Sequence, residues 1–475
     1  MKKLASLTAF LLFAFPGQLL ASETSTILDL TDHPVGYASL AIFIIAYIFV
    51  MAEEFTHLRK SKPVILAAGI IWAMIAIVYA NNGMPHAAEV AVRHNFLEYA
   101  ELMFFLLVAM TYINSMEERN IFNTLRAWLV SKGYSFRQLF WMTGILSFFI
   151  SPVADNLTTA LLMCAVVMAV GGTNNKFIGL GCINIVVAAN AGGAFSPFGD
   201  ITTLMVWQKG ILEFQTFFYL FIPSVVNFIV PAAIMHFAIP NEQPDTSPET
   251  EVMKRGARRI IGLFLLTIAT AVSFHSFLHL PPVIGMLTGL SYLKFFGYYL
   301  KKTHDYEKSP MDPEKADQHI GDSVPFDVFD KVARSEWDTL FFFYGVVLSV
   351  GGLAFIGYLG MTSEVMYNQW GATQANIVVG ILSAIVDNIP VMFAVLTMNP
   401  DMSMGQWLLV TLTAGVGGSL LSIGSAAGVA LMGMAQGKYT FFGHLKWAPV
   451  IALGYAASIA VHLWLNASLF DQAIT

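Results

Sequence analysis

Residues 151–156 read SPVADN and stand in the middle of an apolar stretch that runs from residue 136 to residue 171. A second apolar stretch, residues 372–398, is interrupted in the same way by SAIVDNIP at residues 383–390. Proline and paired polar residues break a helix, and in lipid a broken helix is tolerated only where protein or a water-filled cavity surrounds its freed backbone groups. These breaks are therefore the first places to look for function.

The whole chain is poor in charge. Of its 475 residues, 56% are hydrophobic and only 12% are charged, whereas a soluble domain carries about 25% charged residues. This composition excludes a water-soluble globule and predicts one all-α polytopic membrane domain, because a span uses ~20 residues and the chain is long enough for roughly a dozen. The net charge of −6 offers no basic surface for nucleic acid.

The sequence predicts a signal peptide followed by three further parts. Residues 1–21 have the pattern of a signal peptide, with two lysines before a short apolar run; an uncleaved first span is the alternative. Cleavage would leave the mature N-terminus in the periplasm. We expect outer helices and a first repeat in 22–240, cytoplasmic loops and connecting helices in 241–335, and a second repeat in 336–475.

Basic residues decide whether the two interrupted stretches cross the membrane, because Lys and Arg concentrate in cytoplasmic loops. If residues 136–171 and 372–398 each enter and return on one side, only Arg93 and Lys209 face outward among the Lys and Arg residues after the signal peptide. A full crossing by the first stretch would put the basic cluster at residues 254–259 outside. We therefore predict two re-entrant hairpins.

Three pairs of short segments recur in the same order in the two halves. They are ELMFF at 101–105 and DTLFF at 338–342, the S-x-x-x-D-N runs at 151–156 and 383–388, and the glycine-rich segments 192–200 and 417–425. In the predicted topology the helix of Glu101 runs inward and that of Asp338 runs outward, so the repeats are inverted. Inverted repeats with discontinuous helices near mid-membrane are typical of secondary transporters.

The helix breaks also hold the ionisable side chains. A charged side chain at mid-membrane costs at least ~2.5 kcal/mol and is a functional hypothesis by default. Asp155, Asp200 and Asp387 lie in the breaks. The neighbouring amides and hydroxyls belong to Asn156, Asn190, Asn388, Ser151, Thr202, Thr203, Ser383, Ser422 and Ser425. Hard cations prefer oxygen ligands, and a desolvated carboxyl group binds protons more tightly, so one group can exchange H+ for a metal ion.

Two plainer interpretations stay open. Asp155 and Asp387 are good helix caps, and each could simply cap the second helix of its hairpin. Glu101 could simply pair with Arg93 or His94. The cluster of His94, Glu98 and Glu101 is also a candidate proton-binding or pH-sensing element, because histidine titrates near neutral pH.

The runs SPVADNLTT (151–159), NAGGAFSPFGDITT (190–203) and VDNIP (386–390) together resemble the NhaD-type sodium/proton antiporters of the ion transporter superfamily. The resemblance covers essentially the whole chain. It implies a multi-pass homodimer in a bacterial inner membrane that exports cytoplasmic Na+ or Li+ in exchange for external H+, supporting salt tolerance and alkaline pH homeostasis. No cofactor, enzymatic activity or nucleic-acid partner is expected.

The resemblance also implies where the ions bind. The first repeat would supply Asp155, Asn156, Asn190, Asp200, Thr202 and Thr203 with Ser151, and Na+ or Li+ would compete with protons at Asp155 and Asp200. The second repeat would supply Ser383, Asp387, Asn388, Ser422 and Ser425. We expect the hairpins and broken helices to move as one unit past a scaffold of outer helices.

The rival function is a carrier that couples Na+ to an organic anion or an oxyanion. Such a carrier needs cationic or donor-rich groups facing its cavity, and no Lys or Arg stands in any break. A membrane enzyme ranks third, because the chain has no nucleophile–base pattern and no metal motif.

Overall fold

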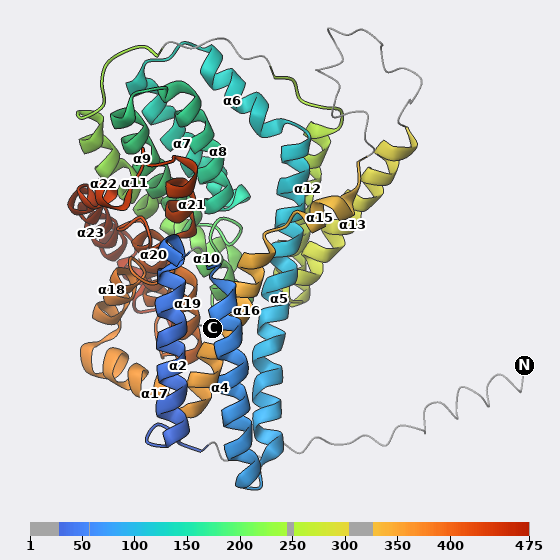
Figure 1. Ribbon diagram of the computed structural model, residues 1–475, viewed down its shortest axis with the longest axis vertical. Helices are drawn as coiled ribbons and strands as arrows, with labels where there is room; N and C mark the ends of the chain where they lie inside the picture. Colours follow the sequence, from blue (N-terminus) through green and yellow to red (C-terminus); the bar gives the residue numbers. More distant parts are fainter. Residues whose placement is uncertain (1–27, 57, 245–250, 304–325, 475) are drawn as a thin grey trace, which may run out of the picture.

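The computed structural model describes residues 28–56, 58–244, 251–303 and 326–474, which form helices and no β-strand (Figure 1). The expected signal peptide lies outside these residues. Eight described helical segments are long and apolar enough to cross a membrane. They are α2 (Pro34–Met51), α4 (Ser61–Asn81), α5 (Pro85–Glu118), α9 (Asn175–Gly193), η1 with α11 (Phe214–His236), α12 (Ala257–Leu278), α16 (Trp337–Ile356) and α23 (Ala448–Leu465). The predicted all-α polytopic membrane fold is confirmed.

Shorter helices complete the fold. Those around the interrupted stretches are α7 (Phe136–Ala154), α8 (Asn156–Gly171), α10 (Ile201–Gln208), α18 (Ala372–Leu382), α19 (Asn388–Met398), α20 (Met404–Gly417) and α21 (Ala426–Met434). The connecting helices are α3 (Glu53–Thr56), α6 (Ile121–Ser131), α15 (Val328–Ala333), α17 (Tyr358–Ser363), η2 (Glu364–Trp370), α22 (Phe441–Leu445) and η3 (Ala467–Leu469).

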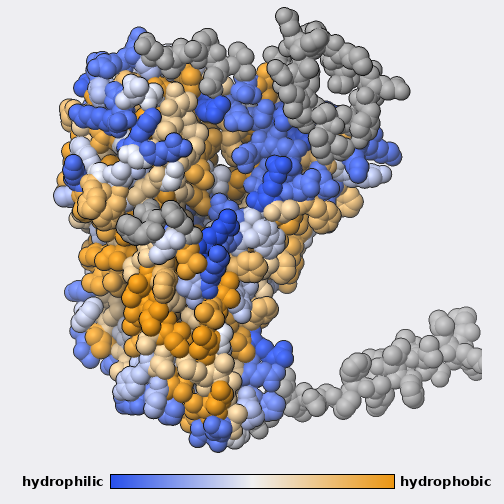
Figure 2. Space-filling model, viewed as in Figure 1, coloured by the Kyte–Doolittle hydropathy of each residue, from blue (hydrophilic) through white to orange (hydrophobic). Residues whose placement is uncertain are grey.

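The outer surface suits lipid. Large aliphatic side chains are exposed on α2, α4 and α12, among them Ile45, Leu66 and Leu265. Figure 2 shows apolar side chains over the middle of one face and hydrophilic ones toward the lower end and the upper right. A soluble monomer rarely exposes so extensive an apolar surface, so these helices are expected to face the bilayer.

The spanning helices and the helices around the interrupted stretches pack into two groups. The scaffold group consists of α2, α4, α5, α12, α13 (Pro282–Lys302) and α16, in which α16 packs on α4 and α5 while α13 packs on α12 and α5. The hairpin group consists of α7–α11, α18–α21 and α23, in which α7 and α8 pack on α9, α18 packs on α20, and α11 packs on α23. Among these helices, α16 against α19 is the main direct contact between the groups.

Two central helices of the scaffold group, α5 and α16, run antiparallel. Asn95 on α5 lies against Gly351, whereas Asn114, further along α5, donates a hydrogen bond to the carbonyl of Lys331, just before α16 (3.0 Å). Helix α7 starts shortly after α5 ends, and α18 starts shortly after α16 ends. The α7–α8 hairpin and the α18–α19 hairpin therefore open toward opposite ends of the molecule (Figure 1).

Both hairpins are held by the same contacts. Ser151 Oγ donates a hydrogen bond to the carbonyl of Ala189 on α9 at 2.7 Å, and Ser383 Oγ donates one to the carbonyl of Ala414 on α20 at 2.7 Å. Gly192 lets α9 approach the backbone of α7, and Gly417 does the same for α20 and α18. The sequence matches between the two halves thus correspond to matching close contacts.

We predict that Gly192→Ala and Gly417→Ala each destabilise the protein. An added methyl group would collide with the Phe148 carbonyl in the first case and with the Gly380 carbonyl in the second, and overpacking typically costs ~1–3 kcal/mol. The melting temperature of the purified protein in detergent measures the effect.

Gly69→Ala is the control, because Gly69 is an exposed helical glycine with nothing within 4 Å of an added methyl group. Its melting temperature should stay the same or rise, since alanine favours a helix by up to about 1 kcal/mol over glycine. An equal loss in all three variants would contradict the close-contact explanation.

Candidate functional site

The break between α7 and α8 is built around Asp155. Pro152 lies in the last turn of α7, and Asp155 follows with φ = 57° and ψ = 164°, a backbone conformation that residues with a side chain rarely adopt. Its carboxylate accepts hydrogen bonds from the backbone N–H and the hydroxyl of Thr158, at 2.8 and 2.9 Å. Asp155 therefore does cap α8, as the plainer interpretation expected, and it also faces a cavity described below.

The break between α9 and α10 is built around Asp200, which is 4% exposed. Its carboxylate accepts the backbone N–H of Thr202 at the start of α10 (3.1 Å). It also accepts the side-chain amide of Asn388, whose nitrogen lies 3.3 and 3.4 Å from its two oxygens. A residue of the second half thus contacts a carboxylate of the first.

A chain of amides makes a second link between the halves. The Asn156 amide donates to the side-chain oxygen of Asn190 (3.0 Å), and the Asn190 amide donates to the hydroxyl of Ser425 (3.1 Å). Ser425 stands at the start of α21, the position that Asp200 occupies at the start of α10. Asn156, Asn190 and Ser425, all named from the sequence, therefore meet between the two broken regions.

Asp387 differs from the other two carboxylates. It stands just before α19, yet its side chain makes no capping hydrogen bond, so the capping interpretation is wrong for this residue. Its Oδ2 lies 3.6 Å from the ammonium nitrogen of Lys60. Its Oδ1 is buried and has no hydrogen-bond partner among the described residues.

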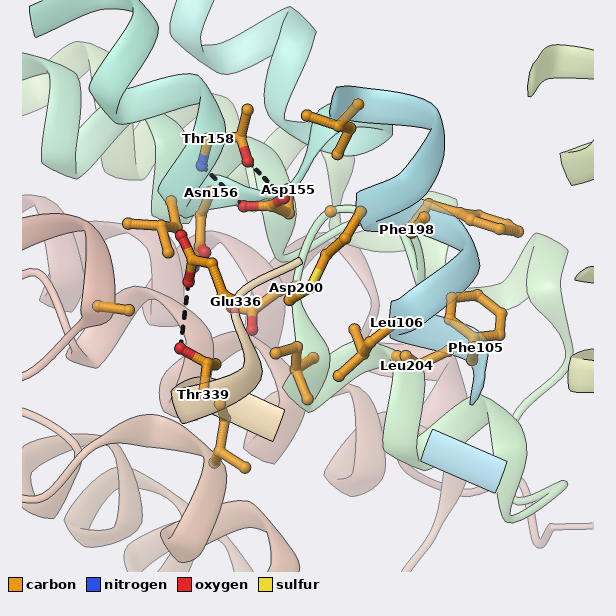
Figure 3. A pocket seen from close by; sticks show the side chains of 18 of the residues that line it. Phe105, Leu106, Asp155, Asn156, Thr158, Phe198, Asp200, Leu204, Glu336 and Thr339 are labelled. Carbon is orange, nitrogen blue, oxygen red and sulfur yellow. Dashed lines mark hydrogen bonds between the residues drawn. The ribbon is translucent and has the colours of Figure 1, made fainter. Parts of the chain in front are cut away.

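These carboxylates surround a cavity of about 100 Å³ between the two helix groups (Figure 3). Its polar lining includes Asp155, Asn156, Thr158, Asp200, Asp387, Asn388, Lys60, Glu336 and Thr339. Phe105, Phe198 and Leu204 form part of its apolar wall. A neighbouring cavity of about 260 Å³ shares Lys60, Glu336 and Asp387 with the first. The two cavities therefore adjoin one another at Lys60, Glu336 and Asp387.

Most of the predicted hydroxyls do not line this cavity. Ser151 and Ser383 bond helix carbonyls, as described above, and Thr203 donates to the carbonyl of Ala194 (3.3 Å). Ser422 and Thr202 are fully buried. In this conformation these residues lie behind the wall, where the hydrogen bonds of Ser151, Ser383 and Thr203 hold the broken helices in position.

The three pH-sensing candidates lie together at a separate cavity of about 190 Å³, next to the ends of α10 and α19. Glu98 pairs with Lys209 (2.5 Å) and with His94 (3.2 Å). Glu101 lines the same cavity, and neither Arg93 nor His94 pairs with it in the described part of the chain. Glu101 therefore faces a cavity and does not form the ion pair with Arg93 or His94 that the plainer interpretation expected.

Lys60 and Glu336 line the cavity but escaped the sequence analysis. Both precede apolar helices, α4 and α16, and Lys60 entered only as one of the loop charges. A search for cations within the breaks could not find Lys60, because it approaches the break from another part of the chain. A charged residue immediately before an apolar helix is the one local signal that both share.

Known proteins resemble this chain closely. Residues 39–415 match the family described as Citrate transporter. The Na(+)/H(+) antiporter NhaD of Alkalimonas amylolytica is 61% identical over 467 residues, which is 97% of this chain and 96% of that protein. This chain belongs to the NhaD family. Another NhaD, from Vibrio cholerae, is 60% identical over 474 residues, covering 98% of both chains.

The NhaD family membership confirms the resemblance found in the sequence. A more distant relative, sodium/proton antiporter 1 of Arabidopsis thaliana, is 32% identical over 459 residues, covering 92% of this chain and 74% of that protein.

We predict that Asn190→Ala destabilises this NhaD-family protein. The change removes both hydrogen bonds of a fully buried amide and deprives Asn156 and Ser425 of a partner. Each buried polar group left unsatisfied costs about 1–3 kcal/mol. The melting temperature in detergent should fall by several degrees.

The control for this prediction is Asn368→Ala, which removes an exposed amide that bonds Glu364 within one helix. It should leave the melting temperature nearly unchanged. A melting temperature equal to wild type for Asn190→Ala would contradict a structural role for the amide chain.

Proposed function

We propose that the protein is a secondary antiporter that exports Na+ or Li+ in exchange for H+. The observation that carries the proposal is a single cavity lined by Asp155, Asp200 and Asp387. Carboxylate and amide oxygens suit a small hard cation, and carboxylates withdrawn from water also favour protonation. The relatives from Alkalimonas amylolytica, Vibrio cholerae and Arabidopsis thaliana are each named sodium/proton antiporters, which supports this assignment.

Proton and cation would compete for the same carboxylates. With Asp155 and Asp200 ionised, a cation entering the cavity relieves the cost of two buried charges; with a proton on either group, that attraction weakens. Asn388 can assist both states, because its amide bonds Asp200 directly. Exclusive occupancy by protons or by a cation is the requirement for coupled exchange.

An organic anion fits this cavity poorly. Its described lining contains the carboxylates of three aspartates and Glu336 but only one cationic side chain, Lys60, which is already paired with Asp387. A dianion would meet net negative charge. The description of the matched family, Citrate transporter, does not decide the substrate, since one fold hosts sites for different ligands.

Alternating access would follow from the arrangement of the helices. We propose that the two halves are inverted repeats and that the hairpin group moves as a unit past the scaffold group. Three features support this proposal: the hairpins open toward opposite ends, matching serine and glycine contacts hold them, and the cavity lies at the boundary between the groups. Such repeats commonly rock around a fixed central site.

The remaining expectations belong to the same proposal. The protein would lie in a bacterial inner membrane with its N-terminus periplasmic, work as a homodimer without a cofactor, and respond to alkaline pH through His94, Glu98 and Glu101. Light scattering of the detergent-solubilised protein measures the oligomeric state.

The exchange activity is tested in everted vesicles. We expect NaCl or LiCl to dissipate the acidification that respiration builds in vesicles containing the wild-type protein, as followed with a pH-sensitive dye. Asp155→Asn and Asp200→Asn should each abolish this response while the protein still inserts, because each removes a charge that both ions need.

Asp401→Asn is the matched control, since Asp401 is exposed and lies outside the cavity. It should keep the wild-type response. No response of the wild-type vesicles to either cation would refute antiport, and full activity of both cavity variants would reduce Asp155 and Asp200 to helix caps.

The topology is tested by labelling single cysteines with a membrane-impermeant maleimide. We expect Asn82→Cys, between α4 and α5, to react in intact cells, and Lys132→Cys, after α6, to react only in everted vesicles; both positions are exposed. The native Cys164 and Cys182 are buried and provide a low background. The reverse pattern would overturn the proposed orientation.

A further inference from the structure

Two ion pairs connect the scaffold side to the hairpin group in the described part of the chain. Glu98 of α5 pairs with Lys209 at the end of α10, and Lys60, just before α4, pairs with Asp387 in the break before α19. The second pair differs from the first because one of its members, Asp387, lies in the proposed ion site. Both of its side chains are largely withdrawn from water, at 17% and 14% exposure.

Lys60 is positioned as a cation of the site rather than as a surface charge. Its ammonium lies 4.5 Å from the centre of the Phe342 ring, a cation–π arrangement that fixes it beside the cavity. It lines both the central cavity and the larger neighbouring one. Lys60 therefore lies at the boundary where the two cavities adjoin.

Asp387 has the capacity to accept another cation. One of its oxygens faces Lys60 and the other is buried without a hydrogen-bond partner among the described residues. The adjacent Asn388 bonds Asp200, so Asp387 is connected to the carboxylate of the first half. A buried carboxylate oxygen without a donor is costly, and Na+ would supply the missing interaction.

We propose that Lys60 is a tethered competitor of the transported cation, a role that rests on the proposed antiport. In the present conformation its ammonium neutralises Asp387. Na+ or Li+ that enters the site takes over this carboxylate and releases Lys60, which also breaks an ion pair between the scaffold side and the hairpin group. Loading of the site and freedom of the hairpin group to move are thereby coupled.

The test is a double-mutant cycle in everted vesicles at one fixed pH, with the apparent KM for Na+ as the readout. Lys60→Met should lower KM by up to about fivefold, which corresponds to the upper end of the ~0.2–1 kcal/mol that one exposed charge pair contributes. Asp387→Asn should raise KM, because an unpaired ammonium then repels Na+. The double variant should have a lower KM than Asp387→Asn alone.

Other outcomes overturn the proposal. An unchanged KM in Lys60→Met means that the ammonium does not compete. If the double variant has the same KM as Asp387→Asn, Asp387 is only a ligand. If both single variants lose the same melting temperature without a change in KM, the pair is only structural. Lys60→Arg keeps the charge and should stay closer to wild type than Lys60→Met.

Lys62→Met is the matched control. Lys62 is exposed and lies two residues away in the same segment, so its removal changes the net charge equally without touching the site. Its KM should equal that of the wild type. Absence of Na+-dependent exchange in the wild type would refute the antiporter assignment itself, whereas an active wild type with a failed cycle would refute only the role of Lys60.

Discussion

The structure is organised around one constraint: a carboxylate buried among apolar helices is costly unless it is paired or hydrogen-bonded. A buried charge needs either a partner or hydrogen bonds, and the helix breaks supply them, because the start of a helix presents unpaired N–H groups. Asp155 and Asp200 each accept such a group, from Thr158 and Thr202. Without the breaks there would be no free donors at this depth, and without the carboxylates the broken backbone would be unsatisfied.

Close packing makes the breaks possible. The serine–carbonyl bonds of Ser151 and Ser383 and the glycines at the helix crossings hold each hairpin against its broken helix. Small residues at such crossings let backbones approach, as in other membrane helix pairs. The hairpin and its broken helix can therefore move together without losing the geometry of the carboxylates between them.

Much of this arrangement could be predicted from the sequence, because the breaks, the repeated segments and the scarcity of charge are local or statistical features. The structure brings Asn156 together with Asn190 and Asn388 together with Asp200. The sequence could not predict which charged residues outside the breaks reach the cavity. Lys60 and Glu336 line it from loops that are distant from the breaks in the sequence. Whether Asp387 caps α19 was also left open by the sequence, because capping depends on side-chain orientation rather than on residue type alone.

The hydrogen bond from Asn388 to Asp200 has a consequence for the stability of the whole chain. Residues from both halves form this site, so the site exists only while the two halves are folded against each other. Anything that binds there binds the native state and not the unfolded one, and so stabilises it. In a salty medium the cargo would thus reinforce the very fold that exports it.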